Sequence, residues 1–466
     1  MLPIGRRPSA RTRSDPGQLA LASPTLVGAS TGEKKASRTP LLTLGFVALL
    51  IYVYVIHSYK LPLAQAAMIV GVLSLLVQGR PVRFPPGSIW YAAFLVWGIL
   101  FYTASLYSND VPALWWEAVK LPTIMVVVAN VLGNSRQIRA FIVFWLAVYA
   151  LYPVRGILFN FVFRIHTSGR YAWNFIFQNP NEFACFTLLP LGLCVAIARS
   201  NFSKSVRWAA AAGVLVLTVT IFLTQSRAGL IGLATFGLMV LATERRRFRV
   251  IAVGAVLTGV VLFTAPPEVW KRLGGLSKLS SAETIGEADP EGSAAARFAI
   301  MRVAWAVFKE HPVTGVGFGV YEEAHADYMR HTVDRSLPAT VEGPRDTHNA
   351  YLRVLAESGV VGLALFLAWL FQTFAYLVRA VRRVRLRDET HTRQLQVLTA
   401  CWAGYWVAAL FGGLNRAAFP FLFAGVMYAL AEHYMRGGDP GTVADQPAGR
   451  IGFRGTRAAP AGRRRI

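Results

Sequence analysis

The stretch that decides the fold reads THNAYLRVLAESGVVGLALFLAWLFQTF and covers residues 347–374. A polar segment ends at its start, and an apolar run without charges fills residues 360–374. A run of this kind forms a helix that crosses a bilayer, because lipid offers no partner for exposed backbone groups. We therefore predict a membrane-spanning helix over residues 349–378, with His348 on its first turn at the aqueous edge.

Apolar runs of similar length recur along most of the chain, which has 466 residues, 54% of them hydrophobic. The pattern predicts an all-α, polytopic membrane protein with a transmembrane helical domain over residues 41–436. The basic segments 1–40 and 437–466 are predicted to be disordered cytoplasmic tails. The twelve predicted spans lie near residues 41–57, 61–79, 88–107, 112–133, 138–159, 181–199, 207–224, 227–243, 248–266, 349–378, 395–412 and 417–436.

The distribution of basic residues predicts the orientation. Arginine clusters fall in the even-numbered loops and in both tails, which places these segments and both termini in the cytoplasm. A net charge of +24 is compatible with nucleic-acid binding, but in a membrane protein it indicates cytoplasmic loops beside anionic lipid. Two long segments then face outward: residues 160–180 and a large, partly helical periplasmic loop over residues 267–347. The three cysteines fall within apolar runs, so no disulfide framework or zinc site is expected.

His348 is the candidate catalytic residue. The partial positive charge at a helix N-terminus disfavours imidazolium, so the ring is predicted to stay neutral near pH 7. A neutral imidazole can accept a proton and act as a general base. The alternative is a histidine that only hydrogen-bonds the backbone of the loop.

Two short breaks between spans carry further polar residues on the outward side. Pro180 directs Asn179 away from helical geometry, and Asn181 is predicted to cap the span that follows. Ser226 is predicted to cap the next outward helix, which puts Arg227 on its first turn. An arginine beside a helix N-terminus is favourable when it shares an anion with that helix, and guanidinium matches phosphate with two parallel hydrogen bonds. The alternative for Arg227 is an interfacial side chain that reaches water.

The large outward loop has its own internal order. Residues 293–310 repeat apolar side chains every three to four positions and predict an amphipathic helix in the outer interface, with Arg297 near its start and Trp305 as an anchor. Three closely spaced glycines from Gly315 predict a compact turn. The acidic and histidine residues at 322–331 have no firm zinc spacing and are interpreted as a solvated helical face. Beyond His348, Arg353 and Glu357 are four residues apart and predict an ion pair.

In order and spacing these features resemble the O-antigen ligase family, which includes related polysaccharide polymerases. The resemblance extends from about Arg170 to Phe374. It is carried by the following pieces: Asn179-Pro180-Asn181, Ser226-Arg227-Ala228-Gly229, Arg297 with Trp305, His311-Pro312, Gly315-Val316-Gly317, and His348-Asn349 followed by Glu357, Gly359 and Gly362.

The resemblance implies a metal-independent, inverting glycosyltransferase of the bacterial inner membrane. It would move a glycan from a polyprenyl-diphosphate carrier to an acceptor hydroxyl of the lipid A-core type on the periplasmic face, without any cofactor. The partners implied are the lipid-linked donor, a lipid or glycan acceptor and membrane lipids, and not nucleic acid. The residues implied are His348 as the catalytic residue, Arg227, Arg297 and Arg170 for the diphosphate, and Asn349, Glu357, Asn179 and Asn181 in supporting positions.

Two alternatives stay open. A polymerase of the same family would join two lipid-linked repeat units, and it needs the same donor site and the same kind of hydroxyl. An anion or small-solute transporter would carry broken helices and polar groups near the bilayer midplane. In this sequence the polar groups concentrate at the outward edge, which favours the transferase.

Overall fold

The computed structural model describes residues 41–58, 62–79, 81–157, 163, 179–244, 246–264, 293–332 and 342–437. The two tails that were predicted to be disordered lie outside these ranges. So does Arg170, together with most of the first long outward segment.

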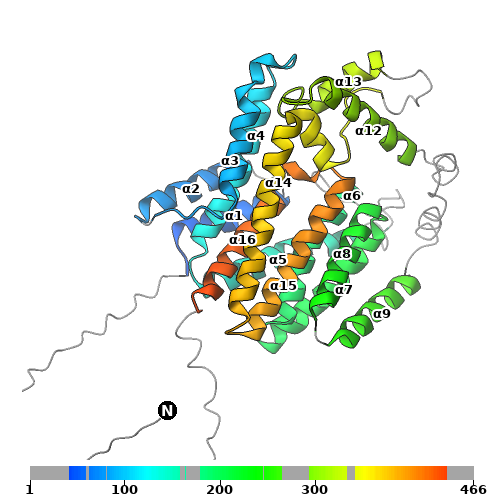
Figure 1. The fold of residues 1–466 in the computed structure, drawn as a ribbon. Helices are drawn as coiled ribbons and strands as arrows, with labels where there is room; N and C mark the ends of the chain where they lie inside the picture. The colour runs from blue at the N-terminus through cyan, green and yellow to red at the C-terminus, as the bar shows by residue number, and fades with distance from the viewer. Residues whose placement is uncertain are drawn as a thin grey trace, which may run out of the picture. The chain divides into compact units, whose positions relative to one another are not determined.

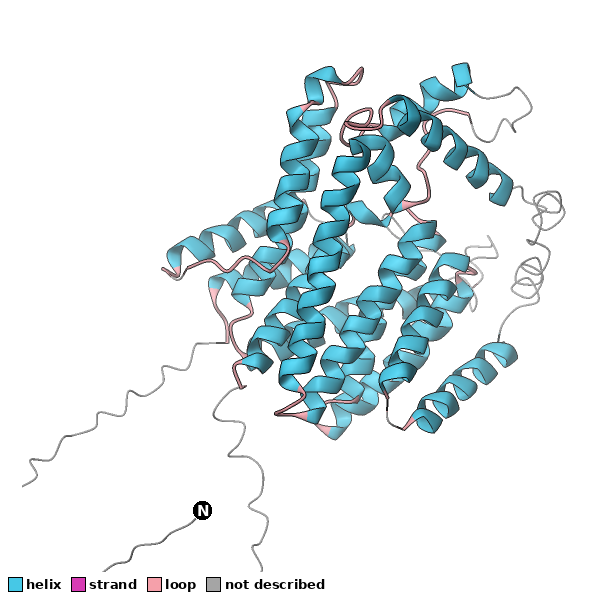
Figure 2. Cartoon of the chain, in the orientation of Figure 1, coloured by secondary structure: helices cyan, strands magenta, loops and turns pink. Residues whose placement is uncertain are grey.

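The described residues form helices and turns, with no strand among them, in agreement with the predicted all-α class (Figures 1 and 2). The helices are α1 (Leu44–Ser58), α2 (Ala64–Val77), α3 (Ser88–Leu100), α4 (Val111–Val131), α5 (Ser135–Ile157), α6 (Pro180–Ala198), α7 (Lys204–Leu223), α8 (Arg227–Thr243), α9 (Arg247–Thr264), α12 (Ser293–Glu310), α13 (Tyr321–Thr332), α14 (Ala350–Val384), α15 (Glu389–Ala408) and α16 (Ala418–Met435). Short 3₁₀ turns lie at η1 (Tyr102–Ala104), η7 (Ala409–Phe411) and η8 (Leu414–Arg416).

One helix falls on each segment that the sequence predicted to span the membrane. Four of them, α4, α6, α7 and α14, are both long and apolar enough to cross a bilayer. Helices α1, α2, α3 and α8 are apolar but shorter. The protein therefore has several apolar helices suited to a membrane, and the full set of twelve spans stays a prediction.

The helix starts follow local capping chemistry. Asn179 is the N-cap of α6 and accepts a hydrogen bond from the backbone N–H of Asn181 at 3.0 Å, with Pro180 as the first helical residue. The prediction that Asn181 caps this helix was therefore wrong, because proline takes the first helical position and moves the cap back to Asn179. Ser226 caps α8, as predicted, by accepting from Gly229 N–H at 3.2 Å.

Helix α6 lies at the centre of the core. It is apolar on all sides, and 78% of its spanning window is buried against α7, α8, α15 and other neighbours. Close approach of α8 to α15 depends on small residues, since a side chain at Gly232 would overlap the carbonyl oxygen of Gly404. The core that results holds the N-terminal ends of α6 and α8 in fixed positions beside each other.

Helix α12 confirms the predicted amphipathic helix with the same bounds. Val303 and Val307 are buried against the rest of the fold, whereas Phe298 is 57% and Trp305 is 50% exposed. An apolar face thus remains on the outside of the helix. Its placement in the membrane interface stays a prediction.

Helix α14 reverses direction at Gly359, where the backbone takes φ 65° and ψ −170°. The ring centroids of Tyr351 and Phe366 are 6.4 Å apart, whereas 15 residues of straight helix extend about 22 Å. Residues 350–358 therefore fold back beside residues 360–366, and Figure 1 shows the yellow chain turning at the end nearest α12 and α13. The prediction of one continuous helix over residues 349–378 was therefore wrong.

The glycine turn of the large loop stabilises this reversal. Val316 N–H donates to Ala356 O at 3.0 Å and Gly317 N–H donates to Glu357 O at 3.1 Å, so carbonyl groups released by the bend regain partners. A side chain at Gly359 would overlap the carbonyl of Val313, so this position requires glycine for space as well as for its positive φ. The compact turn predicted from the glycine spacing is confirmed, and it holds the bend closed.

The predicted orientation is testable by cysteine labelling. Lys309 on α12 and Arg387 after α14 are both exposed, and the native cysteines are buried. In cells without an outer-membrane barrier, a membrane-impermeant thiol reagent is expected to label Lys309→Cys at once and Arg387→Cys only after permeabilisation. The reverse pattern would invert the topology and place the large loop in the cytoplasm.

Candidate functional site

His348 is held in an unusual backbone conformation directly before α14. Its φ is 51°, a left-handed value that is uncommon for residues other than glycine. It precedes Asn349, the N-cap of α14, which accepts from the N–H groups of Tyr351 and Leu352 at 3.0 Å. His348 therefore lies two residues before the helix rather than on its first turn as predicted, and tight capping on its C-terminal side fixes its position.

Asp346 is a carboxylate that contacts His348. Its Oδ2 accepts from the backbone N–H of His348 at 3.2 Å and lies 3.7 Å from the imidazole Nδ1. The imidazole side chain is 30% exposed, so it is accessible from one side. A carboxylate beside Nδ1 favours the tautomer that carries its proton there, which leaves Nε2 as the proton acceptor.

The environment lowers the pKa of His348 below its ordinary value. Burial is the main cause, Asp346 acts in the opposite direction, and Arg297 and Arg345 lower the pKa further. The neutral ring expected from the sequence agrees with this direction. The main physical cause is desolvation, however, rather than the helix dipole.

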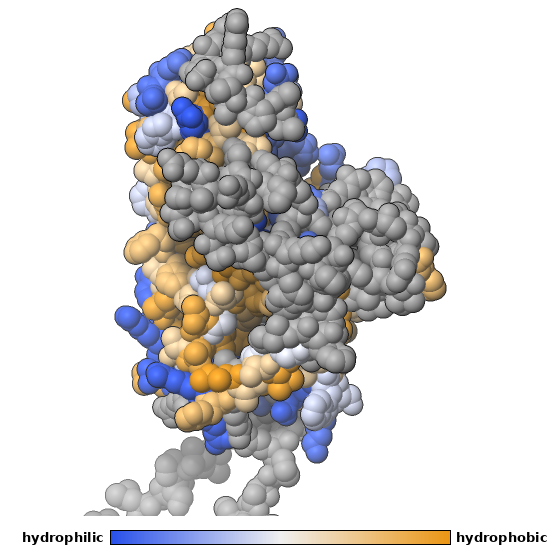
Figure 3. All heavy atoms as spheres, turned by 90° about the vertical axis from the view of Figure 1, so that its right-hand side faces the viewer, coloured by the Kyte–Doolittle hydropathy of each residue, from blue (hydrophilic) through white to orange (hydrophobic). Residues whose placement is uncertain are grey.

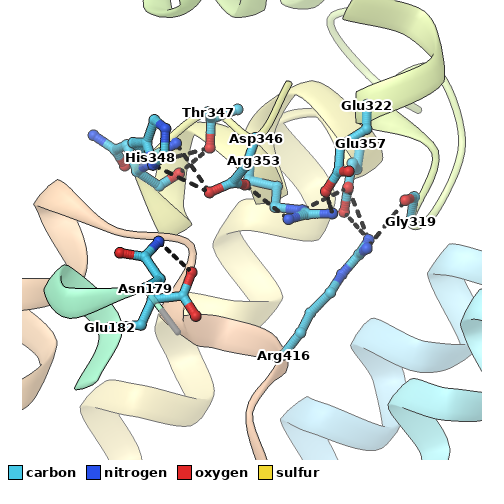
Figure 4. A network of polar contacts seen from close by, with 11 residues as sticks. Asn179, Glu182, Gly319, Glu322, Asp346, Thr347, His348, Arg353, Glu357 and Arg416 are labelled. Atoms are coloured by element: carbon cyan, nitrogen blue, oxygen red, sulfur yellow. Dashed lines mark hydrogen bonds and ion pairs between the residues drawn. The ribbon is translucent and has the colours of Figure 1, made fainter. Parts of the chain in front are cut away.

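Asp346 also belongs to a buried network of charges, which it joins through its other carboxylate oxygen (Figure 4). Arg353 donates from Nε to Glu357 Oε1 at 3.0 Å, from Nη1 to Asp346 Oδ1 at 2.8 Å and from Nη2 to Glu322 Oε1 at 3.0 Å. Arg416 donates to both oxygens of Glu357 at 2.8 and 2.7 Å. The predicted pair of Arg353 and Glu357 is present, and it is one link in a longer chain.

The network is costly to disturb. The Arg353 side chain is 8% exposed and that of Glu357 is 3% exposed, so neither charge is stabilised by much water. Arg353 donates from each of its three side-chain nitrogens to a different carboxylate, so its charge is already matched within the network. Its contribution is to hold Asp346, and through Asp346 the loop that carries His348.

Two of the predicted diphosphate-binding arginines are described. Arg297 on α12 lies close enough to His348 to act on its charge. Arg227 is the first residue of α8, and its buried Nε has no hydrogen-bond partner among the described residues. Gly229 packs against Ala184 of α6, which brings the start of α8 beside the start of α6. The third, Arg170, lies outside the described residues.

The start of α6 faces the same network. Asn179 donates from Nδ2 to Glu182 Oε1 at 3.3 Å, and Glu182 lies within electrostatic reach of Asp346 and Arg353. Figure 4 shows Asn179 and Glu182 close to the series of polar contacts that joins His348, Asp346 and Arg353. Asn179 and Asn349 thus act as helix caps at the site. The supporting role of Asn181 stays a prediction.

Several residues of the site were missed from the sequence, namely Glu182, Glu322, Asp346 and Arg416. Asp346 could have been predicted, because an acidic residue two positions before a candidate catalytic histidine can contact it. Arg416 lies in the break between two apolar runs, where a charged residue is unremarkable. Glu322 was assigned to a solvated face, and its ion pair with Arg353 corrects that interpretation.

Two of the neighbouring acidic and histidine residues, His325 and Asp327, contact other groups. His325 Nδ1 lies 2.9 Å from Gly343 O, and Tyr107 donates to Asp327 at 2.6 Å. Among the residues that the structure describes, no group of three or more His, Cys, Asp or Glu side chains is arranged to hold a metal ion.

The fold and site together define an all-helical membrane protein with a histidine held by a buried charge network at one end of its helices. Residues 186–367 match the family model described as O-Antigen ligase, a segment that contains Arg227, Arg297, His348 and Glu357. The match confirms the resemblance found in the sequence over that segment. The matched family is described as O-antigen ligase, so the match indicates an enzyme of the O-antigen ligase or polymerase type. No curated protein matches the chain.

Proposed function

We propose that the protein is an O-antigen ligase-like glycosyltransferase. It transfers a glycan from a polyprenyl-diphosphate carrier to an acceptor hydroxyl, of the lipid A-core type, on the outer face of the inner membrane. The observation that supports this most is His348, which is half-buried, disfavoured as imidazolium, and held beside Asp346 with cationic residues near. A polymerase that uses a second lipid-linked unit as acceptor is the alternative that the same site would serve.

The proposed reaction is one displacement. Nε2 of neutral His348 takes the proton of the acceptor hydroxyl as its oxygen bonds the anomeric carbon. The bond from that carbon to the diphosphate oxygen breaks, and the diphosphate leaves with the electron pair, so the anomeric configuration inverts. Asp346 stabilises the imidazolium that forms, as a carboxylate does beside a catalytic histidine. No step in this scheme needs a metal or an organic cofactor.

The arginines are proposed to stabilise the leaving group. Charge builds on the diphosphate as the glycosidic bond breaks, and fixed guanidinium groups favour that charge more than they favour the intact donor. Arg227 has a buried Nε with no partner among the described residues, and Arg297 lies within electrostatic reach of His348. Arg170 is proposed for the same role from the family resemblance alone.

Lysine substitutions test the arginine assignment. Arg227→Lys and Arg297→Lys keep a positive charge but lose the forked hydrogen bonds, so each is expected to lower transfer by about tenfold or more. Arg302→Lys is the matched control, since Arg302 is exposed on the same helix as Arg297. If both lysine variants keep the turnover and donor affinity of Arg302→Lys, then Arg227 and Arg297 do not bind the diphosphate and are only interfacial arginines.

The rate is expected to depend on pH through His348. The pKa of His348 is lowered from its ordinary value of about 6.5, so the ring is still neutral at pH 6.5. The rate is therefore expected to stay high at that pH and to fall only in more acidic buffer. Asp346 raises this pKa, so Asp346→Asn is expected to lower the rate and also to move the acid limb of kcat/KM to still lower pH. An acid limb that does not move in this variant would show that another group controls the profile.

A further inference from the structure

A large cavity lies away from His348, between α6, α7, α8 and α9. Its volume is about 810 Å³, and most of its wall is apolar, including Val195, Leu215, Phe222, Phe236 and Val240. Figure 3 looks onto this side of the molecule and shows hydrophobic side chains around a hollow, with hydrophilic residues below it. An apolar space of this size is unfavourable if it is filled with water, which indicates an apolar occupant.

One end of the cavity is basic. Arg199, Arg246 and Arg393 line it together with a single carboxylate, Glu244. Arg199 Nη1 lies 3.0 Å from Glu244 Oε2, and Arg393 is paired at 2.7 Å with Glu389, which is not part of the wall. Glu244 is the one carboxylate among the three arginines of this wall, so repulsion between Arg199 and Arg393 remains. An anion between these arginines would relieve that repulsion.

The basic end lies far from the proposed catalytic site. Arg199 is the C-cap of α6, whereas Asn179, the N-cap of the same helix, lies beside the His348 network. A helix of 19 residues separates these two ends by about 28 Å. The occupant of this cavity is therefore distinct from the diphosphate of the proposed donor.

We propose that this cavity binds a membrane phospholipid with an anionic head group. The acyl chains lie against the apolar wall between α7 and α8, and the phosphate lies among Arg199, Arg246 and Arg393. Basic pockets between membrane helices recognise anionic head groups in this way. The bound lipid would fill the space between α9 and its neighbours and so fix the position of α9. This site goes beyond the proposed transfer reaction.

Two glycines offer a matched pair of variants. Gly237 on α8 lines the cavity and has no atom within 4 Å of where a side chain would begin. A leucine there projects into the cavity without a clash. Gly259 on α9 is equally open but is not among the lining residues, so Gly259→Leu adds the same side chain elsewhere. Both changes replace glycine within a helix, which favours helix formation equally.

The test is native mass spectrometry of the full-length protein after delipidation and incubation with equal amounts of phosphatidylglycerol and phosphatidylcholine. The parent and Gly259→Leu are expected to retain phosphatidylglycerol in preference. Gly237→Leu is expected to weaken retention about tenfold, since leucine displaces about two methylene groups of the lipid. The double variant Arg199→Gln, Arg393→Gln is expected to lose the preference between the lipids, whereas Arg383→Gln, at an exposed position, is not.

Three results would overturn the proposal. One is equal retention of both lipids by the parent, and another is a Gly237→Leu protein that binds like Gly259→Leu. The third is complete displacement of phosphatidylglycerol by inorganic phosphate, which would mean that the arginines hold a free anion and the apolar wall plays no part. Each result concerns lipid binding alone, and glycan transfer can be measured separately on the same proteins.

Discussion

His348→Ala is expected to slow glycan transfer by about 10²–10⁴-fold, the contribution of a positioned general base. Donor binding is expected to persist, because the arginines and not the histidine are assigned to the diphosphate. The measurement is single-turnover transfer together with donor affinity on the purified variant. His348→Gln sharpens the result, since glutamine keeps a hydrogen bond but cannot take the proton.

His433→Ala is the control for this experiment. His433 lies near the C-terminal end of α16, beside the cavity lined by Arg139 and His391, and has no assigned role in transfer. Its loss is expected to leave turnover close to that of the parent. If His348→Gln works as well as the parent, the residue positions the acceptor, and the assignment as base is wrong.

Arg353→Met is expected to destabilise the protein by about 3–5 kcal/mol, the cost of leaving buried charges without their partner. Methionine fills a similar space, so the effect reports the three carboxylates that lose their donor, Glu357, Asp346 and Glu322. Thermal unfolding in detergent measures the change. Transfer is expected to fall as well, because Asp346 loses the contact that orients it toward His348.

Arg382→Met supplies the comparison on the same helix. Arg382 is exposed in the last turn of α14, where a substitution is expected to change stability by no more than about 0.5 kcal/mol. Equal unfolding midpoints for the two variants would show that the network is solvated and contributes little to the fold.

The helices could be predicted from the sequence because their signals are local. Each signal lies within one continuous segment of the chain. The signals are apolar runs of membrane length, the cap at Ser226 and the amphipathic repeat of residues 293–310. The reversal at Gly359 could not be predicted, since the apolar pattern continues through it. It depends on contacts with Pro312, Val316 and Gly317, which lie some 40 residues earlier in the chain.

The same distinction separates the parts of the site. Arg353 and Glu357 are four residues apart, so helical spacing predicts their pair. Arg416 reaches Glu357 across 59 residues of sequence, and Glu322 reaches Arg353 across 31. Such contacts arise when α13, α14 and the segment before α16 pack together, and no local pattern encodes them. The family resemblance implied roles for His348, the two described arginines and Glu357, but it did not point to Asp346, the carboxylate that contacts the histidine.

The most direct measurement is transfer in vitro. Purified protein is incubated with a defined polyprenyl-diphosphate glycan and two competing acceptors, lipid A-core and a second lipid-linked unit. The proposal predicts glycan on lipid A-core with inverted anomeric configuration, together with free polyprenyl diphosphate. Glycan on the second lipid-linked unit instead would make the protein a polymerase. Retained donor binding without any transfer to either acceptor would contradict the enzyme assignment and favour a transporter.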